Sequence, residues 1–291
     1  MLHMYRVLND QSIPDDAGVA IEYKIPYTSK RVDFLLSGHD GDVDSVVIVE
    51  LKQWSEVEKV EGKEAIVKTA LNRGIHEVAH PSYQAWSYAA LIEDYNENVQ
   101  EQLIKLKPCA YLHNYRKLQN YPLTDSYYDY YLSLAPVYAK GDVENLRTFI
   151  KKYIKYGDNK DILYQIEQGR IRPSKSLQDS LGSMLKGNQE FVMIDEQKVI
   201  FETALQLAKR AIKTGTEQVM IVEGGPGTGK SVLAINSLVA LTNKSMTCQY
   251  VTKNSAPRNV YSTKLKGDFR KTRIVTHLRN LEVTQNLNLM N

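Results

Sequence analysis

The sequence predicts an α/β fold, in which a mixed sheet flanked by helices is followed by a second, partial α/β domain. Three apolar, strand-like runs follow one another closely before residue 52 and are separated by short polar turns. Longer stretches with helical spacing then alternate with further apolar runs. Near residue 225, a glycine-rich loop stands between an apolar run and an amphipathic stretch, which is the order strand, loop, helix.

The composition limits the class of protein. A chain of 291 residues suggests about two domains, and 43% hydrophobic with 24% charged residues is usual for a globular protein. No apolar run reaches the ~18 residues of a membrane span, and Met1–Pro14 lacks a signal peptide's apolar stretch, so a cytoplasmic protein without a membrane partner is expected. Two cysteines, Cys109 and Cys248, lie in different predicted domains and cannot form a disulfide framework.

The first predicted elements are three neighbouring strands. They cover residues 19–25, 31–36 and 45–51, where β-branched and aromatic residues are frequent. The turns between them, at residues 26–30 and 37–42, are short and rich in Gly, Pro, Ser and Asp. Since turns of this length join antiparallel partners, the three strands should form two consecutive hairpins.

Two helices and two further strands should complete the first domain. Residues 82–95 have helical spacing of their apolar side chains. The runs at residues 109–115 and 132–138 are predicted to extend the sheet. A second helix should cover residues 142–155, with Asp142 as its N-cap after a glycine.

Tyrosine is frequent, with 19 residues, and it gathers between Tyr121 and Tyr138. Exposed rings there could stack on nucleic-acid bases. The favoured interpretation is that the rings lie on a half-buried strand and its turn. The net charge of +3 does not decide between these alternatives, because a nearly balanced chain can still gather its basic residues on one face.

The C-terminal half predicts another strand and helix series. Residues 157–187 are polar and are expected to be connective or loosely helical, and an amphipathic helix should run over residues 196–213. A buried strand is expected at Val219–Val222, a helix at 232–241 and a second strand at 248–252.

These elements predict a domain at residues 1–156, a connecting segment at 157–190 and an incomplete domain at 191–291. About 60 residues follow the glycine-rich loop, and they include no acidic strand able to serve as a Walker B motif. The sequence therefore suggests a fragment, a naturally short form, or one part of a motor that another chain completes.

The glycine-rich loop fits the Walker A pattern at every required position. Its glycines would let backbone N–H groups surround phosphates, Lys230 would reach the β- and γ-phosphates of ATP, and the Ser231 hydroxyl would bind Mg²⁺. The residues assigned to this nucleotide site are Gly224, Gly225, Gly227, Thr228, Gly229, Lys230 and Ser231. Nucleotide binding is a stronger expectation than hydrolysis.

A second group of polar residues follows the predicted hairpin. Asp33 lies on the second strand, and Glu50 and Lys52 share one face at the end of the third by the two-residue period of a strand. Two carboxylates and the Leu51 carbonyl could bind Mg²⁺ or Mn²⁺, which polarises a phosphate and activates water. The lysine could stabilise the developing negative charge. The alternative is a solvated strand end, although charged residues are unexpected after the apolar run 46–49.

Gln84 and Tyr88 are four residues apart and so lie on one face of the predicted helix, where they could position a substrate. Such a pair is also common on ordinary amphipathic helices. Together with Asp33, Glu50 and Lys52, the pair resembles the PD-(D/E)XK nuclease superfamily, and in particular its RecB-like branch. The resemblance implies a restriction-endonuclease-like sheet and Mg²⁺-dependent cleavage of DNA. One departure is Val32, where the proline of the motif's name would stand.

The segment around Gln197 and residues 252–256 resemble elements of superfamily 1 helicases. In that resemblance Gln197 corresponds to the glutamine that reads adenine, and residues 252–256 to a segment that touches a single strand. The alternative is a helix start with an acidic cluster and an ordinary strand end.

Taken together, the chain resembles the Schlafen group 3-like DNA/RNA helicase family with an N-terminal RecB-like nuclease domain. The motifs RVDFLLSG, VIVELKQW, QAWSY and GGPGTGKS carry this resemblance over most of the chain. It implies a nuclease coupled to an ATP-binding, RecA-like P-loop segment that processes DNA, with RNA left open, in restriction of foreign DNA such as phage or in repair. The alternative is a non-cleaving nucleic-acid and nucleotide-binding module, acting as a homo-oligomer or with a partner chain.

Overall fold

The computed structural model describes residues 2–26, 28–72, 74–117, 121–170, 191–248 and 250. Its contacts divide the chain into two compact units. The first comprises Met1–Ser174 and Phe191–Ile221, and the second comprises Lys175–Glu190 and Val222–Asn291. Residues 191–221 therefore group with the first unit, whereas the sequence prediction started the second domain at residue 191.

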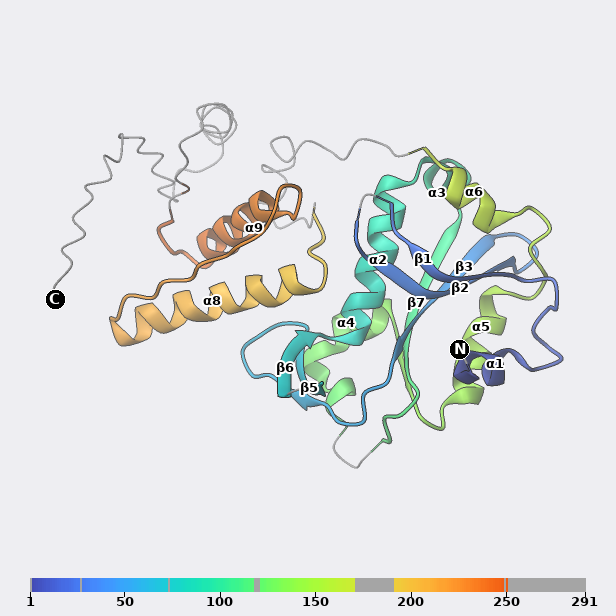
Figure 1. The fold of residues 1–291 in the computed structure, drawn as a ribbon, viewed down its shortest axis with the longest axis horizontal. Helices are drawn as coiled ribbons and strands as arrows, with labels where there is room; N and C mark the ends of the chain where they lie inside the picture. Colours follow the sequence, from blue (N-terminus) through green and yellow to red (C-terminus); the bar gives the residue numbers. More distant parts are fainter. Residues whose placement is uncertain are drawn as a thin grey trace. The chain divides into compact units, whose positions relative to one another are not determined.

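The first unit is built on a five-stranded mixed sheet in the order β1-β2-β3-β7-β8 (Figure 1). The strands are β1 (Gly18–Lys24), β2 (Arg31–His39), β3 (Asp44–Lys52), β7 (Lys105–Leu112) and β8 (Val137–Ala139). The first three pair antiparallel, as the short turns predicted, and β7 and β8 continue the sheet in parallel with β3. The predicted α/β class with a mixed sheet is confirmed.

Helices cover both faces of this sheet. One face carries α1 (Leu2–Leu8) and α5 (Val143–Tyr153), and the other carries α2 (Pro81–Tyr95), α3 (Glu97–Glu101) and α6 (Ile162–Gln168). The helices predicted at 82–95 and 142–155 are confirmed as α2 and α5. Asp142 occupies the N-cap of α5, although its side chain makes no capping hydrogen bond to that helix.

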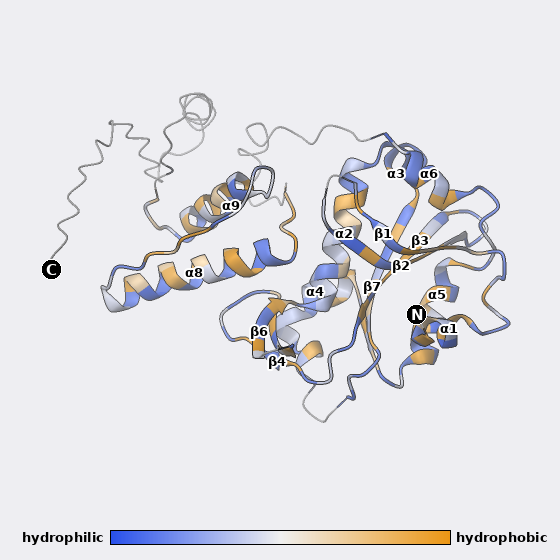
Figure 2. Ribbon diagram, viewed as in Figure 1, coloured by the Kyte–Doolittle hydropathy of each residue, from blue (hydrophilic) through white to orange (hydrophobic). Residues whose placement is uncertain are grey.

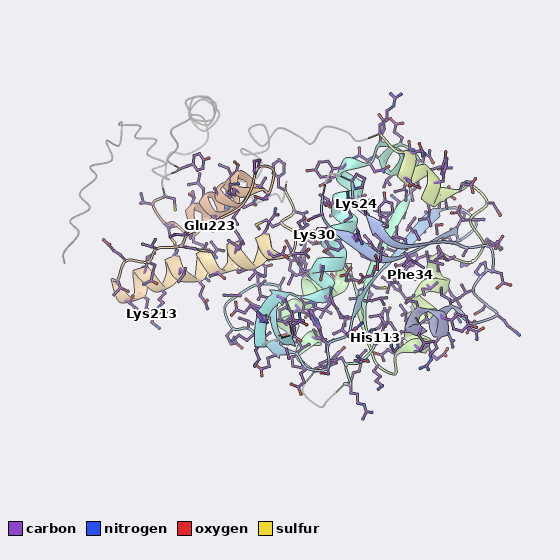
Figure 3. All side chains as sticks on the ribbon, viewed as in Figure 1. Lys24, Lys30, Phe34, His113, Lys213 and Glu223 are labelled. Atoms are coloured by element: carbon purple, nitrogen blue, oxygen red, sulfur yellow. The ribbon has the colours of Figure 1, made fainter. Side chains whose placement is uncertain are left out.

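The alternation of side chains along β3 produces the two cores. Val47 and Val49 pack with α1 and α5, whereas Val46 and Ile48 pack with α2, α3 and α6. All four side chains are fully buried, which makes the strand apolar on both faces. Phe34 of β2, labelled in Figure 3, belongs to the first of these cores. The charged residues at the end of β3 therefore follow a strand with no exposed face.

A second, three-stranded antiparallel sheet was not predicted from the sequence. It contains β4 (Glu58–Lys59), β5 (Ile66–Leu71) and β6 (Gly74–Ala79). The helix α8 (Glu196–Thr214), predicted at 196–213 and confirmed, packs against β5 and β6. Figure 2 shows hydrophilic and hydrophobic residues alternating along this helix.

The strand predicted at 132–138 is wrong over most of its length. Residues Asp129–Leu134 form α4, and only β8 is extended. The tyrosines explain the difference, because Tyr128 and Tyr131 are three residues apart and bury both rings, as helical spacing allows. Their hydroxyls donate to Ile66 O at 2.9 Å and to Glu64 Oε1 at 3.2 Å. Tyr130, between them, is 57% exposed.

In the second unit, the helix predicted at 232–241 is confirmed as α9 (Lys230–Asn243). The buried strand predicted at Val219–Val222 is wrong: these residues are not extended in a sheet, and Val219 and Ile221 are 86% and 80% exposed. A buried strand needs neighbours on both sides, and no described strand pairs with this segment. Of the strand predicted at 248–252, only Cys248 and Tyr250 are described, and neither is in a strand. No described helix is long and apolar enough to cross a membrane.

Candidate functional site

Asp33 and Glu50 face one another where β2 and β3 separate. The last paired residues of the hairpin are Phe34 and Val49, so the next step of the same register places Asp33 opposite Glu50. At this point Asp33 Oδ2 accepts the backbone N–H of Leu51 at 2.7 Å in place of a ladder bond. The juxtaposition of the two carboxylates that the sequence predicted is therefore present.

Glu50 is almost fully buried, and its two oxygens differ. Its Oε1 accepts a hydrogen bond from Lys52 Nζ at 2.7 Å. Its Oε2 is buried and accepts no hydrogen bond from the described residues. A carboxylate oxygen without a hydrogen bond is costly to bury, and no hydrogen bond from the described residues offsets this cost.

The electrostatic environment of Glu50 favours its neutral form. Burial raises the pKa of Glu50 most, Lys52 lowers it, and the nearby carboxylates of Asp33 and Asp195 raise it further. The result is a pKa of about 7 against an ordinary value of 4.5. A cation bound at this carboxylate would lower that pKa, because it would stabilise the charged form.

The predicted pair on α2 also meets as expected. Gln84 Nε2 donates to the Tyr88 hydroxyl at 3.0 Å, one helical turn away. Tyr88 packs in the core on the face of the sheet that α2 covers, and burial raises its pKa, followed by the carboxylates of Asp195 and Glu50. Its phenol therefore stays protonated and acts as a hydrogen-bond donor.

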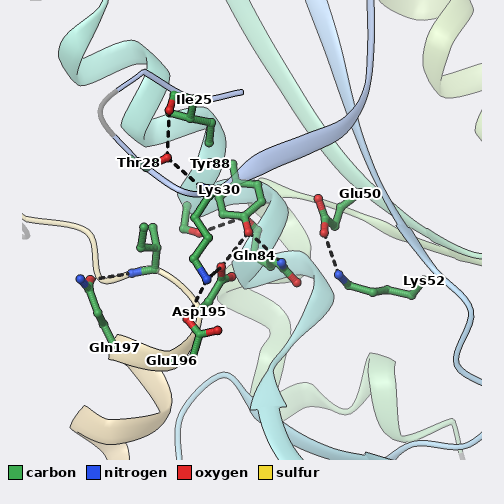
Figure 4. A network of polar contacts seen from close by, with 12 residues as sticks. Ile25, Thr28, Lys30, Glu50, Lys52, Gln84, Tyr88, Asp195, Glu196 and Gln197 are labelled. Atoms are coloured by element: carbon green, nitrogen blue, oxygen red, sulfur yellow. Dashed lines mark hydrogen bonds and ion pairs between the residues drawn. The ribbon is translucent and has the colours of Figure 1, made fainter. Parts of the chain in front are cut away.

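Two residues at this site were not predicted from the sequence as site residues. Lys30, in the loop before β2, places its Nζ 2.7 Å from Asp195 Oδ2 and 2.7 Å from Glu196 Oε2 (Figure 4). The Tyr88 hydroxyl donates to the same Asp195 Oδ2 at 2.7 Å. Asp195 was interpreted only as part of an acidic helix start. Its distance of 107 positions from Tyr88 along the chain left no local signal.

The donor set is compatible with a hard divalent cation. Among the described residues, no group of three or more His, Cys, Asp or Glu side chains is placed to bind a metal ion. Mg²⁺ is commonly held by one or two carboxylates together with water and substrate phosphate, so Asp33 and Glu50 meet that requirement. The orphaned Glu50 Oε2 fits this role, with the Leu51 carbonyl as a further oxygen.

The glycine-rich loop of the second unit contains two glycines with positive φ angles. Gly227 and Gly229 have φ angles of 76° and 82°, which glycine adopts at little cost. Lys230 begins α9, and its Nζ donates to the carbonyls of Gly224 and Gly225, both at 2.5 Å. The Thr228 hydroxyl donates to the Gly225 carbonyl at 2.9 Å. The lysine is thus folded onto the loop whose amides would surround a phosphate.

Gln197 lies in the first unit, near the start of α8. Its Oε1 accepts the backbone N–H of Ile194 at 3.2 Å, so the amide already takes part in the turn that opens the helix. Residues 252–256, predicted to touch a single strand, lie outside the described residues.

Comparison with known families gives one match. Residues 217–288 match the family model of the Schlafen group 3, DNA/RNA helicase domain. The match covers about a quarter of the chain and includes the whole glycine-rich loop, residues 224–231. No curated protein and no solved structure matches the chain. The second unit is therefore similar to a helicase domain, while the site around Glu50 lies outside the matched residues.

Proposed function

We propose that the first unit is a metal-dependent nuclease that hydrolyses phosphodiester bonds of DNA. One observation carries the proposal: Asp33 faces Glu50 at the end of the buried run 45–50 of β3, and Glu50 Oε2 is buried without a hydrogen-bond partner among the described residues. A solvated strand end, the alternative interpretation, would leave both carboxylates in water. Burial of a carboxylate that keeps one oxygen without a hydrogen bond is instead typical of active sites.

Each residue has a role in this proposal. Asp33, Glu50 and the Leu51 carbonyl would hold Mg²⁺ or Mn²⁺, which polarises the scissile phosphate and lowers the pKa of an attacking water. Lys52 would stabilise negative charge that develops on the phosphate, because its Nζ lies beside Glu50. Gln84 and Tyr88 would orient the substrate by hydrogen bonds to the DNA backbone.

The second unit would bind ATP at the phosphate loop. Lys230 would leave the loop carbonyls for the β- and γ-phosphates, and Ser231 would bind the Mg²⁺ of the nucleotide. Gln197 would read adenine. A nuclease joined to a helicase-like segment would serve in restriction of foreign DNA or in repair. The helicase-like segment would act as a homo-oligomer or with a partner chain that completes the motor.

The test is cleavage of labelled single- and double-stranded DNA with Mg²⁺ or Mn²⁺. The variant Glu50→Gln keeps the shape of the side chain and removes its charge, so cleavage should fall about 100-fold or more. Glu93→Gln, an exposed glutamate of α2, is the matched control and should cleave as the wild type does. Equal cleavage by Glu50→Gln, or no cleavage by the wild type with either metal, would overturn the proposal.

A second candidate is a nucleic-acid and nucleotide-binding module that does not cleave. Its support is the similarity of residues 217–288 to a helicase domain, together with the lack of a three-residue acidic ligand group among the described residues. DNA bound without cleavage, and released by ATP in the wild type but not in Lys230→Ala, would favour this candidate.

A further inference from the structure

Lys30 is held rigidly toward the site by its own loop. The Thr28 hydroxyl donates to the Ile25 carbonyl at 2.9 Å and accepts the backbone N–H of Lys30 at 3.1 Å (Figure 4). The backbone N–H of Ile25 in turn donates to the Lys30 carbonyl at 3.0 Å. These bonds close the turn before β2 and fix the direction in which the lysine leaves the backbone.

The Lys30 ammonium and the Tyr88 hydroxyl converge on a single oxygen. Both lie 2.7 Å from Asp195 Oδ2, and Gln84 orients the phenol from the next turn of α2. A cation and a neutral donor that meet at one acceptor are suited to an anionic oxygen, and a phosphate offers the same charge and similar oxygen spacing as a carboxylate.

Asp195 itself is poorly accommodated. Its Oδ1 is buried and accepts no hydrogen bond from the described residues, and its side chain is only 13% exposed. Its backbone has φ 45° and ψ −112°, a conformation that non-glycine residues rarely adopt. The carboxylate also lies close enough to Glu50 for the two negative charges to repel. The unsatisfied oxygen, the backbone conformation and the repulsion by Glu50 thus all disfavour this position of the Asp195 side chain. The contacts with Lys30 and Tyr88 offset these unfavourable terms.

We propose that Lys30 and Tyr88 form a subsite for a backbone phosphate of single-stranded DNA, and that the Asp195 carboxylate occupies this subsite in the present structure. The inference rests on the proposed nuclease function and adds to it a positioning residue, Lys30, outside every motif of the sequence. It also makes the start of α8 a competitor of the substrate. DNA can bind fully only when Asp195 withdraws.

The remaining contacts of α8 allow this withdrawal to be local. Further along the helix, Lys198 and Glu202 are buried and paired at 2.9 Å, and Thr203 accepts a hydrogen bond from Lys63 at 3.0 Å. The contact with Lys63, and that of Glu202 Oε2 with the backbone N–H of Glu64 at 3.1 Å, join the body of the helix to the loop before β5. Asp195 precedes the first helical residue, so its side chain can leave the site without loss of the buried pairs.

The test measures binding of fluorescein-labelled single-stranded DNA by anisotropy, with the full chain in EDTA so that no cleavage occurs. Asp195→Asn keeps the shape of the side chain and removes the competing charge, and DNA should bind about tenfold more tightly. Glu217→Gln removes one negative charge beyond the opposite end of α8 and is the matched control, with affinity equal to that of the wild type.

Lys30 is tested in the Asp195→Asn background, where the subsite is open. Addition of Lys30→Gln should there weaken binding about tenfold, while Lys24→Gln, an exposed lysine at the end of β1, should weaken it less than threefold. In the wild-type background Lys30→Gln should have a smaller effect, because Asp195 already engages the ammonium. If Lys30 only attracted DNA by its charge, Lys30→Gln would weaken binding equally in both backgrounds. A larger effect in the Asp195→Asn background therefore indicates that Lys30 and Asp195 share one subsite.

Three outcomes would overturn the inference. Unchanged DNA affinity of Asp195→Asn, together with Glu50-dependent cleavage by the wild type, would remove the subsite and leave the proposed nuclease intact. A lowered affinity would assign Asp195 to substrate or metal binding. A melting temperature lowered by more than about 5 °C would show that Asp195 serves the structure. Tighter DNA binding without any cleavage would instead keep the subsite and overturn the nuclease.

Discussion

At the scale of single residues, the site depends on carboxylates that the fold does not fully satisfy. Glu50 and Asp195 each keep one buried oxygen without a hydrogen-bond partner among the described residues. Their roles differ because their backbones differ. Glu50 belongs to a regular strand and cannot move without disrupting the sheet, whereas Asp195 precedes a helix in an unfavourable conformation. The former is suited to a fixed ligand and the latter to a movable competitor.

His80, which lies outside the candidate site, shows how burial changes the pKa of a side chain. Its ring is fully buried before α2, where Nδ1 accepts the backbone N–H of Ser82 at 3.1 Å and Nε2 lies 3.1 Å from the Leu123 carbonyl. Burial lowers the pKa of His80 to about 4 from an ordinary 6.5, although the contact with Leu123 raises it. The native protein therefore keeps this ring neutral at pH values where the unfolded chain is protonated.

We expect this difference to make stability depend on pH. Between pH 6.5 and 4, His80 binds a proton in the unfolded state but not in the native state. The free energy of unfolding therefore falls as the pH falls. The loss should approach about 3 kcal/mol at pH 4. Above pH 6.5 both states are neutral and His80 contributes no slope.

The measurement is urea unfolding at several pH values between 4.5 and 7.5 in wild type, His80→Asn and His76→Asn. Asparagine at position 80 can still accept the Ser82 N–H but does not titrate, so this variant should lose the corresponding part of the slope. His76 is exposed on β6, and its variant should keep the wild-type slope. Equal slopes in all three proteins would contradict the expectation.

At the scale of elements, buried charges join α8 to the loop before β5. Lys198 and Glu202 are 3% and 4% exposed and pair at 2.9 Å, and Glu202 Oε2 also accepts the backbone N–H of Glu64 at 3.1 Å. The Lys198 ammonium lies 5.3 Å from the centre of the Tyr83 ring. A buried pair is sensitive to the loss of one partner, because the other charge then remains in an apolar environment.

Removal of one charge should therefore cost more than removal of both. We expect Lys198→Met to lower the free energy of unfolding by about 3 kcal/mol, and the double variant Lys198→Met/Glu202→Gln to recover most of that loss. The glutamine retains an acceptor for the Glu64 N–H. Lys160→Met, which breaks the exposed pair with Asp44, is the control and should cost about 1 kcal/mol or less.

Urea unfolding followed by circular dichroism would measure all three variants. If the double variant were as unstable as Lys198→Met, the loss would come from packing of the lysine stem and not from an unpaired charge. If Lys198→Met were as stable as Lys160→Met, α8 would not depend on this pair.

The elements also explain what could be predicted from the sequence. The hairpins of β1, β2 and β3 were predictable because apolar runs and short turns are local signals, and they brought Asp33, Glu50 and Lys52 together correctly. The pair Gln84 and Tyr88 followed from helical spacing alone. In contrast, the second sheet packs against α8, and that packing includes contacts distant in sequence, such as that of Lys63, in the loop before β5, with Thr203, 140 positions apart. Local patterns cannot contain such information.

The two strands that were wrongly predicted also depend on contacts between residues distant in sequence. Tyrosine favours strands, but the hydroxyls of Tyr128, just before α4, and Tyr131, within it, donate to β5 and to the loop before β5 in the helical arrangement. The subsite at Lys30 needed the start of α8 to be placed beside α2. By contrast, α9 follows from helical spacing and was predicted, whereas the strand predicted at Val219–Val222 would need neighbouring strands.

At the scale of the whole molecule, one continuous segment belongs to both proposed activities. It begins at Asp195 beside Lys30, continues through α8 and reaches the phosphate loop at Gly224. A signal along this segment would connect the two proposed activities. The first requirement for such a connection is that the loop binds nucleotide through Lys230 and Ser231.

Isothermal titration of ATP into the full chain tests this requirement. In the wild type, Lys230 is expected to exchange the carbonyls of Gly224 and Gly225 for phosphate oxygens, so Lys230→Ala should weaken ATP binding about tenfold or more. Lys244→Ala, at the exposed C-terminal end of α9, should bind ATP as the wild type does.

The variant Ser231→Ala distinguishes the contribution of Mg²⁺ to ATP binding from that of the phosphate contacts. If the Ser231 hydroxyl binds Mg²⁺, this variant should bind ATP equally well with Mg²⁺ and with EDTA, whereas Mg²⁺ should increase the affinity of the wild type. Equal Mg²⁺ dependence in both proteins would assign the metal to other oxygens and leave the role of Lys230 intact. If ATP bound Lys230→Ala and the wild type with the same affinity, the loop would not be the nucleotide site, and a connection through α8 would have no signal to transmit.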